Sequence, residues 1–291
     1  MFRVMASRRV LFTTIFLLGG CLAMDAIFCQ ATLFVPRRDP GPIPTGFANV
    51  SITARDGVKL EAWFRAQEGG NCVMILHGIG DSRRSSAGFA PMFLTAGYSV
   101  LTPDLRGHGT SGGDMVTYGL REKYDVLAWN TWLREHGCRR LYGLGESMGA
   151  AILIQSAALT PEFSAIVAES AYSSLRSIAQ ERIGQMAGFS PALIAPPILE
   201  TSLVYARLRY GVVLSQVSPR ESIRHAQAPI LLIHGLADDR TPPWHSQALA
   251  EANQNAQLWL VPGARHTGAY ATAPDEFQRR VLAWFAEHSE H

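Results

Sequence analysis

The sequence has none of the short motifs that usually hold a metal ion, a nucleotide phosphate or a redox cofactor. There is no Cys-x-x-Cys pair, no His-Glu-x-x-His stretch and no Gly-rich phosphate-binding loop. The formal net charge is only +2, so the chain lacks the strong positive charge of an obligate nucleic-acid binder. Internal repeats and low-complexity tracts are also missing. We therefore expect a protein that uses no cofactor and no metal ion and binds no nucleic acid.

Apolar residues, by contrast, are abundant enough for a full core. The chain has 291 residues, 47% of them hydrophobic. Six short apolar runs are typical of buried parallel strands, namely residues 72–76, 99–102, 140–144, 165–168, 230–233 and 258–261. Ahead of them, residues 50–53 and 60–64 predict a hairpin around Asp56 and Gly57. Helical stretches, most clearly residues 122–135, separate the later runs, which predicts a mostly parallel α/β sheet of eight strands flanked by helices.

A serine stands where one of these strands turns sharply into a helix. Residues 145–149 read Gly-Glu-Ser-Met-Gly and lie between the apolar runs 140–144 and 150–154. Glycines on both sides let the chain turn tightly, so that the Ser147 hydroxyl can project beyond the sheet. The following helix directs free backbone N–H groups to the same place, where they would stabilise a developing oxyanion. The pattern predicts a nucleophilic serine.

The same turn has one competing interpretation. Gly143 and Gly145, between a strand and a helix, also suggest a dinucleotide-binding turn, and Glu169 ends the next apolar run as an acidic ribose ligand would. However, Gly149 lies one position too late for Gly-x-Gly-x-x-Gly, and the turn is in mid-chain. The catalytic serine is therefore favoured.

A serine nucleophile needs a base, and the base needs an acid to orient it. Asp238 follows the run 230–233, and His266 follows the run 258–261. Both occupy loops just beyond predicted strands, as Ser147 does. Two other carboxylates are alternatives for the acid: the adjacent Asp239, and Glu169.

With these residues in place, the sequence resembles the α/β-hydrolase superfamily, in which serine, acid and histidine follow one another in this order. The resemblance runs from about Val50 to the C-terminus. Five separated motifs carry it: residues 76–78 (Leu-His-Gly), 104–109 (Asp-Leu-Arg-Gly-His-Gly), the serine turn, 234–238 (His-Gly-x-x-Asp) and 263–266 (Gly-Ala-x-His). The chain looks most similar to the serine-aminopeptidase-like or lysophospholipase-like branch, which includes membrane-anchored bacterial hydrolases.

The resemblance implies an eight-stranded α/β-hydrolase sheet and a catalytic triad of Ser147, Asp238 and His266. The backbone N–H groups of Ile79 and Met148 would form the oxyanion hole. The implied reaction is acyl transfer on a carboxylic ester, such as a lipid ester, or on a thioester. A peptidase of the serine-aminopeptidase type is the alternative. A catalytically silent binding module is another, although the intact triad argues against it.

Residues 171–226 contain no strand-like run and predict short helices. We expect these helices to form a small cap over the serine, which would shape the substrate pocket. The alternative is that they pack on the flank of the sheet.

Other polar residues near the motifs are expected to have structural roles. The histidines of the turn motifs should support their loops, namely His77, His108 and His234. Two further histidines should lie on surface helices, namely His225 and His245. Asp104 and Arg106 should pair with each other, and Glu146 should orient its loop.

The N-terminal region predicts a link to a membrane. Residues 1–9 form a basic head, and residues 10–35 are mostly apolar, which predicts a transmembrane anchor or a signal segment. Residues 36–49 read as a linker to the hydrolase domain 50–291. Residues 18–21 (Leu-Gly-Gly-Cys) also resemble a lipoprotein cleavage box, so acylation at Cys21 is an alternative, as is simple cleavage. The basic head predicts a membrane-bound enzyme with an extracytoplasmic, periplasmic catalytic domain.

The resemblance also brings two of the four cysteines together. In this fold the strand that begins near Cys72 neighbours the strand that begins just after Cys138. Neighbouring strands lie about 4.8 Å apart, and a disulfide needs Cα atoms within about 7 Å. A Cys72–Cys138 disulfide can therefore form, and an oxidising compartment would favour it. Two free buried thiols are the alternative.

Overall fold

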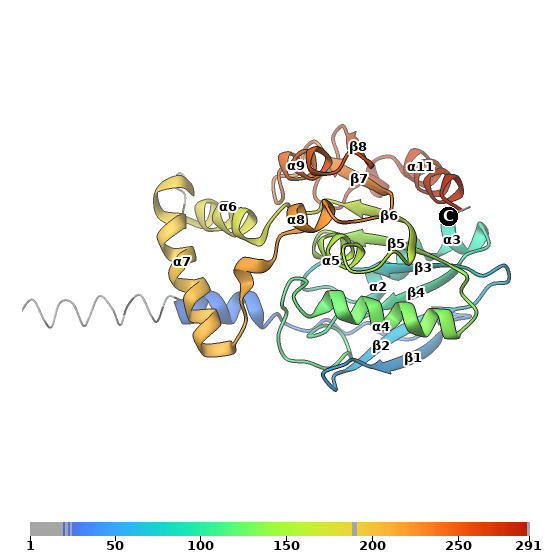
Figure 1. Cartoon of the computed structure of the whole chain (residues 1–291), viewed down its shortest axis with the longest axis horizontal. Helices are drawn as coiled ribbons and strands as arrows, with labels where there is room; N and C mark the ends of the chain where they lie inside the picture. Colours follow the sequence, from blue (N-terminus) through green and yellow to red (C-terminus); the bar gives the residue numbers. More distant parts are fainter. Residues whose placement is uncertain (1–19, 21–22, 24, 188–190, 290–291) are drawn as a thin grey trace, which may run out of the picture.

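The protein folds around one sheet of eight strands, all of which the sequence predicts (Figure 1). The structure is a computed structural model that describes residues 20, 23, 25–187 and 191–289. The strands are β1 (Ala48–Thr53), β2 (Lys59–Arg65), β3 (Asn71–Leu76), β4 (Ser99–Pro103), β5 (Arg140–Glu146), β6 (Phe163–Glu169), β7 (Ile230–Gly235) and β8 (Ala256–Val261). Their order is β1-β2-β4-β3-β5-β6-β7-β8. Strand β2 is antiparallel to β1 and β4, and the other pairs are parallel.

Helices cover both faces of the sheet and enclose two separate cores. Alternate side chains of a strand point to opposite faces. Met74 of β3 therefore joins the core under α4 (Glu122–Glu135), α5 (Met148–Ala157), α8 (Pro219–Ile223) and α9 (Trp244–Ala252). Its neighbours Val73 and Ile75 join the other core, under η1 (Ala87–Phe89), α3 (Ala90–Thr95) and α11 (Pro274–Glu287). The short helices α2 (Arg83–Ser86) and α10 (Ala269–Thr272) lie in the loops near the site.

The order of the central strands brings Cys72 and Cys138 together. Strand β3 lies between β4 and β5, so the predicted crossover is confirmed. Cys72 is in register with Leu141 of β5, and Cys138 lies just before that strand. Their Cα atoms are 5.7 Å apart, and the two side chains form a disulfide. Cys29 is a free, buried thiol.

The predicted cap segment forms helices that project from the sheet. They are α6 (Leu175–Ala187) and α7 (Pro191–Tyr210), followed by η2 (Leu214–Gln216). Figure 1 shows both long helices at one end of the molecule, beyond the strands. Helix α6 nevertheless contacts the loop after β7, because Gln185 Nε2 donates to the carbonyl oxygen of Asp239 at 3.0 Å.

The N-terminal residues that are described pack on the protein itself. Residues 25–33 are helical and lie beside α7 (Figure 1). The following extended segment is attached to the domain, because the Arg37 guanidinium donates to the backbone oxygens of Ser111 and Gly113. None of the helices in the described part of the chain is both long and apolar enough to span a bilayer. Half of the predicted anchor 10–35, Cys21 included, lies outside the described residues.

The predicted pairing of Asp104 with Arg106 is wrong. The Arg106 side chain turns toward helix α4, where its Nε donates to Asp125 at 2.6 Å, and it also reaches Asp56 at 2.8 Å. The Asp104 carboxylate instead accepts the backbone N–H groups of Arg83 at 2.7 Å and of Thr110 at 2.9 Å. Both side chains tie the loop after β4 to the rest of the domain, but each with its own partners.

The disulfide closes a loop across 66 residues of sequence, and closing a loop of this size restricts the unfolded chain. The double variant Cys72→Ser, Cys138→Ser should therefore lose about 3–4 kcal/mol of unfolding free energy, measured by urea denaturation without reductant. Dithiothreitol should lower the midpoint of the wild type and leave the double variant unchanged. Equal midpoints for the two proteins without reductant would contradict the bond.

Candidate active site

Ser147 lies at a strained turn between strand β5 and helix α5. Its backbone has φ +52°, a value that non-glycine residues rarely adopt. The flanking glycines permit this turn because there is no room for a Cβ at either position. A Cβ on Gly145 would lie 2.6 Å from the backbone nitrogen of Ala150, and a Cβ on Gly149 would overlap the carbonyl oxygen of Leu76. The turn therefore raises Ser147 above the end of the sheet, as the sequence predicts.

Three side chains from separate loops form a continuous row of hydrogen bonds. His266 Nε2 lies 3.0 Å from Ser147 Oγ, and His266 Nδ1 lies 2.8 Å from Asp238 Oδ2. Asp238 follows β7 and His266 follows β8, so adjacent strands deliver both groups to the serine. The other Asp238 oxygen, Oδ1, accepts the backbone N–H of Thr241 at 2.8 Å. This is the geometry expected of a serine with a base and an orienting acid.

Asp238 is held as a carboxylate. Burial alone would raise the pKa of this carboxyl, but hydrogen bonds from His234 and His266 and from the Thr241 backbone N–H lower it well below its usual range. His234 is fully buried, and its Nε2 lies 3.3 Å from Asp238 Oδ2. The negative charge that orients His266 is therefore present throughout the neutral pH range.

The two alternative acids do not contact His266. Asp239 is exposed, and the interaction with α6 uses its backbone oxygen only. Glu169 is buried, and its Oε1 accepts the backbone N–H of Ala269 at 2.8 Å. Of the three carboxylates considered from the sequence, the structure brings only Asp238 to the histidine.

The loop after β3 lies directly against the serine. A Cβ built on Gly78 would be 3.5 Å from Ser147 Cβ. The backbone N–H groups of Ile79 and Met148, the expected oxyanion donors, have no acceptor among the described residues. Met148 is the first residue of α5, so its N–H belongs to the unsatisfied end of the helix.

Two buried, neutral histidines support this loop. The Nδ1–H of His77 donates to the carbonyl oxygen of Gly78 at 2.7 Å, and its Nε2 accepts the N–H of Leu105 at 3.1 Å. His108 Nε2 accepts the N–H of Gly80 at 3.0 Å. Burial lowers the pKa of each imidazole to about 4, so both remain neutral and keep one acceptor nitrogen. The supporting role expected from the sequence fits these contacts.

Two glutamates end the neighbouring strands next to the serine. Glu146 and Glu169 are register partners at the ends of β5 and β6. Burial, reinforced by Glu169, raises the pKa of Glu146 to about 8. Burial also raises the pKa of Glu169 to about 7, and its Oε2 has no partner among the described residues. At least one proton is therefore held by this pair at neutral pH.

The pocket at Ser147 is small and polar. It encloses about 320 Å³ and is lined by Gly78, Ile79, Asp81, Ser85, Glu146, Ser147, Arg240, His266 and Thr267. No described side chain of the predicted cap segment 171–226 lines this pocket, so among the described residues the expected cap does not shape it. In the part of the chain that is described, no group of His, Cys, Asp and Glu could hold a metal ion.

One polar cluster is absent from the sequence-based predictions. His245, expected on a surface helix, is instead fully buried, because α6 packs over the start of α9. His245 Nδ1 lies 2.8 Å from Ser173 Oγ, and its Nε2 lies 3.1 Å from Glu181 of α6. This serine, histidine and carboxylate resemble a second triad, but Ser173 is only 3% exposed and lines no substrate pocket. The cluster joins α6 to the core, and no local sequence signal marks it.

A strained serine turn on an eight-stranded sheet, followed by an acid and a histidine, defines the class of α/β hydrolases. Residues 73–280 match the Alpha/beta hydrolase family, and the chain belongs to this family. The finer branch and the N-terminal anchor remain predictions.

Similar proteins include enzymes and proteins without a described activity. A thermostable monoacylglycerol lipase of Bacillus sp. (strain H-257) is 30% identical over 242 residues, which is 78% of this chain and 94% of the lipase. The uncharacterized protein YfhR of Escherichia coli is 27% identical over 257 residues, which is 84% of this chain and 82% of YfhR. The Pyrococcus furiosus esterase Pf2001 has a similar structure, with a TM-score of 0.72, 25% identity, and coverage of 88% of this chain and 98% of that one.

The raised pKa of Glu169 predicts a stability that falls as pH rises. The folded state keeps the proton until pH about 7, whereas an unfolded glutamate loses it near 4.5, so unfolding becomes easier between these values. Glu169→Gln cannot ionise. Its unfolding free energy relative to the wild type should rise from near zero at pH 4.5 to about 3 kcal/mol above pH 7.

Urea denaturation at pH 5 and pH 8 measures this difference. Glu251→Gln, on the exposed side of α9, is the matched control and should change neither value. A Glu169→Gln effect of the same size at both pH values would contradict the assignment of a proton to the folded state.

Proposed function

We propose that the protein is a serine hydrolase that cleaves carboxylic esters through an acyl-enzyme. The observation that supports this most strongly is the row of hydrogen bonds from Ser147 through His266 to Asp238, with separations of 3.0 and 2.8 Å. A serine hydroxyl is a weak nucleophile unless a base accepts its proton as it attacks.

In the proposed reaction, His266 Nε2 accepts the proton of Ser147 Oγ as this oxygen attacks the ester carbonyl carbon. The imidazolium that forms is stabilised by the Asp238 carboxylate on Nδ1. His266 then gives the proton to the departing alkoxide, which leaves as an alcohol. A water molecule, deprotonated by the same nitrogen, attacks the acyl-enzyme and releases the carboxylic acid.

The negative charge on the carbonyl oxygen would be held by the backbone N–H groups of Ile79 and Met148. Removing one such donor in other serine hydrolases costs about 10²–10³-fold in rate. Both amides lack an acceptor among the described residues, and the Gly78 loop that carries one of them touches the serine. Neutral His77 and His108 hold this loop before substrate binds, which limits the reorganisation needed in the transition state.

An ester is the favoured substrate because the similar lipase and esterase act on this bond. The polar pocket beside Ser147, with Asp81 and Arg240 in its wall, suits an ester whose alcohol portion carries hydroxyl groups. A lipid ester with such a head group fits both features, and a thioester would react in the same way. Peptide hydrolysis of the serine-aminopeptidase type is the alternative. A p-nitrophenyl ester series of increasing chain length, run beside aminoacyl p-nitroanilides, separates the two.

We also propose that the catalytic domain lies outside the cytoplasm, held at the membrane by the N-terminal segment or by an acyl group on Cys21. The Cys72–Cys138 disulfide supports an oxidising compartment. Acid quenching of cells, followed by alkylation in urea, tests this. Both side chains are buried in the folded protein, and after unfolding they react only if the enzyme was reduced, as in the cytoplasm.

Ser147→Ala should lower kcat for p-nitrophenyl esters by about 10⁴–10⁶-fold, because the nucleophile is removed while the glycines of the turn remain. Ser173→Ala is the matched control, since it removes the serine of the second, buried cluster. The control should keep its kcat within a few-fold. Retention of most activity by Ser147→Ala, with an unchanged melting temperature, would exclude the covalent mechanism.

Neighbouring aspartates provide a test of the acid. Asp238→Asn should lower kcat by about 10⁴-fold, because the imidazole loses its orienting charge. Asp239→Asn removes a charge one residue away, where the side chain is exposed, and should change kcat less than threefold. A larger loss of kcat in Asp239→Asn than in Asp238→Asn would show that Asp238 is not the orienting acid.

A further inference from the structure

Large apolar side chains project into solvent from two adjacent helices at one end of the molecule. Ile27 of the helical segment 25–33 is 66% exposed, and Val204 and Leu208 of α7 are 57% and 81% exposed. Val204 and Leu208 are four residues apart, so they lie on the same side of α7. We call the surface formed by Ile27, Val204, Arg207, Leu208 and Arg209 the outer face.

The two helices form one unit. The buried carboxylate of Asp25 accepts hydrogen bonds from the hydroxyl groups of Thr201, at 2.9 Å, and Ser202, at 2.8 Å. The Cys29 thiol donates to the carbonyl oxygen of Ser202 at 3.4 Å. Farther along, the rings of Phe34 and Tyr210 pack edge to face at 5.3 Å.

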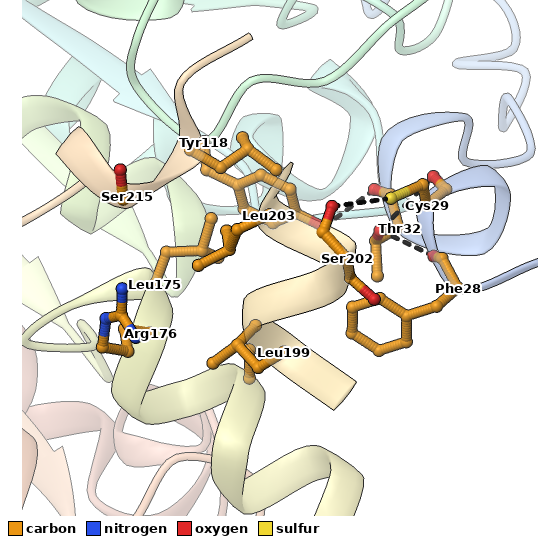
Figure 2. A pocket seen from close by; sticks show the side chains of 12 residues that line it. Phe28, Cys29, Thr32, Tyr118, Leu175, Arg176, Leu199, Ser202, Leu203 and Ser215 are labelled. Carbon is orange, nitrogen blue, oxygen red and sulfur yellow. Dashed lines mark hydrogen bonds between the residues drawn. The ribbon is translucent and has the colours of Figure 1, made fainter. Parts of the chain in front are cut away.

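Apolar side chains fill the inner side of this unit. Figure 2 shows Phe28, Cys29 and Thr32 on one side of a small cavity and Leu199, Ser202 and Leu203 of α7 on another, with Leu175 of α6 beside them. The inner surface is therefore buried within the protein, whereas no described residue covers the outer face.

A groove runs between the two helices on the outer side. Ala26, Ile27, Gln30 and Ala31 line one wall, and Tyr205 and Arg209 line the other. Ile27 therefore faces this groove, whereas Val204 and Leu208 lie outside its lining, on an exposed part of α7.

The outer face carries positive charge. Arg207 and Arg209 lie in the last turn of α7, and neither forms an ion pair with a described residue. The nearby acid of this helix, Glu200, is already paired with Arg176 of α6. Apolar side chains next to arginines are typical of helices that lie in the interface of an anionic bilayer.

We propose that the outer face docks on an anionic lipid bilayer. The sequence that precedes the segment 25–33 has no charged residue from Val10 to Met24, so a long uncharged stretch is joined to the helix that carries Ile27. A second copy of the chain is the less suitable occupant, because a symmetric contact of the outer face would place four arginines in one interface, and the face itself supplies no acid to pair with them. The docked unit of residues 25–33 and α7 would then set the orientation of the hydrolase domain above the lipid. This docking does not depend on the chemistry of Ser147.

Fluorescence from a single labelled position tests the docking. In the full chain carrying Cys21→Ser and Cys29→Ser, bimane is attached through Leu208→Cys or through Leu159→Cys, a control that is also exposed but lies after α5. With vesicles of phosphatidylcholine and phosphatidylglycerol, the label at 208 should shift to shorter wavelength. Brominated lipid should quench it at least twofold, and the label at 159 should be unaffected.

The charge is tested with the double variant Arg207→Gln, Arg209→Gln. In this variant, quenching at 208 should become nearly the same in vesicles with and without phosphatidylglycerol. The control variant Arg279→Gln, Arg280→Gln removes the same number of charges from α11 and should keep the full difference. Equal quenching at 208 and 159, or no quenching at either, would overturn the proposal. A shift at 208 that grows with protein concentration without vesicles would assign the face to a second copy.

Discussion

The close approach of helix α5 to strand β3 is the constraint on which the site depends. At Gly149 the helix backbone lies so near the carbonyl oxygens of Leu76 and His77 that no side chain fits between them. This contact places the start of α5 beside the loop that follows β3. Ser147 and Gly78 consequently touch, and the amides of Ile79 and Met148 belong to the same small space. A strained serine backbone is retained because packing on both sides leaves it no alternative.

Buried polar groups hold the loops around this contact. The surroundings of each group determine whether it is protonated. Asp238 is charged because two histidines and a backbone amide stabilise the anion. His77 and His108 are neutral because burial disfavours a second proton, and neutrality is what leaves each ring one nitrogen to accept a backbone N–H. Glu146 and Glu169 hold a proton because both carboxyl groups are largely desolvated and the charge of one disfavours ionisation of the other. The site is therefore prepared electrostatically before any substrate arrives.

Sequence patterns predicted the strands and the loops that carry the site. The strands and the loops that carry Ser147, Asp238 and His266 follow from apolar runs and motif order, and the crossover that joins Cys72 to Cys138 follows from the resemblance to the α/β-hydrolase fold. Side-chain pairing across the tertiary structure did not follow in the same way. Arg106 pairs with Asp125 rather than Asp104 because helix α4 packs over its loop, and His245 is buried because α6 covers it. The packing of residues 25–33 on α7 could not be predicted from the sequence either, because it joins segments about 175 residues apart through Asp25 and Ser202.

The central claim is that Ser147, rather than any other serine, is the nucleophile. Ser173 is the most informative competitor, because its hydroxyl also lies 2.8 Å from a histidine that contacts a carboxylate. Peptide mapping by mass spectrometry after treatment with a fluorophosphonate tests the claim most directly. Our account predicts one phosphonate per chain, on the peptide that contains Ser147. A phosphonate on the peptide that contains Ser173, or an unmodified chain, would contradict it.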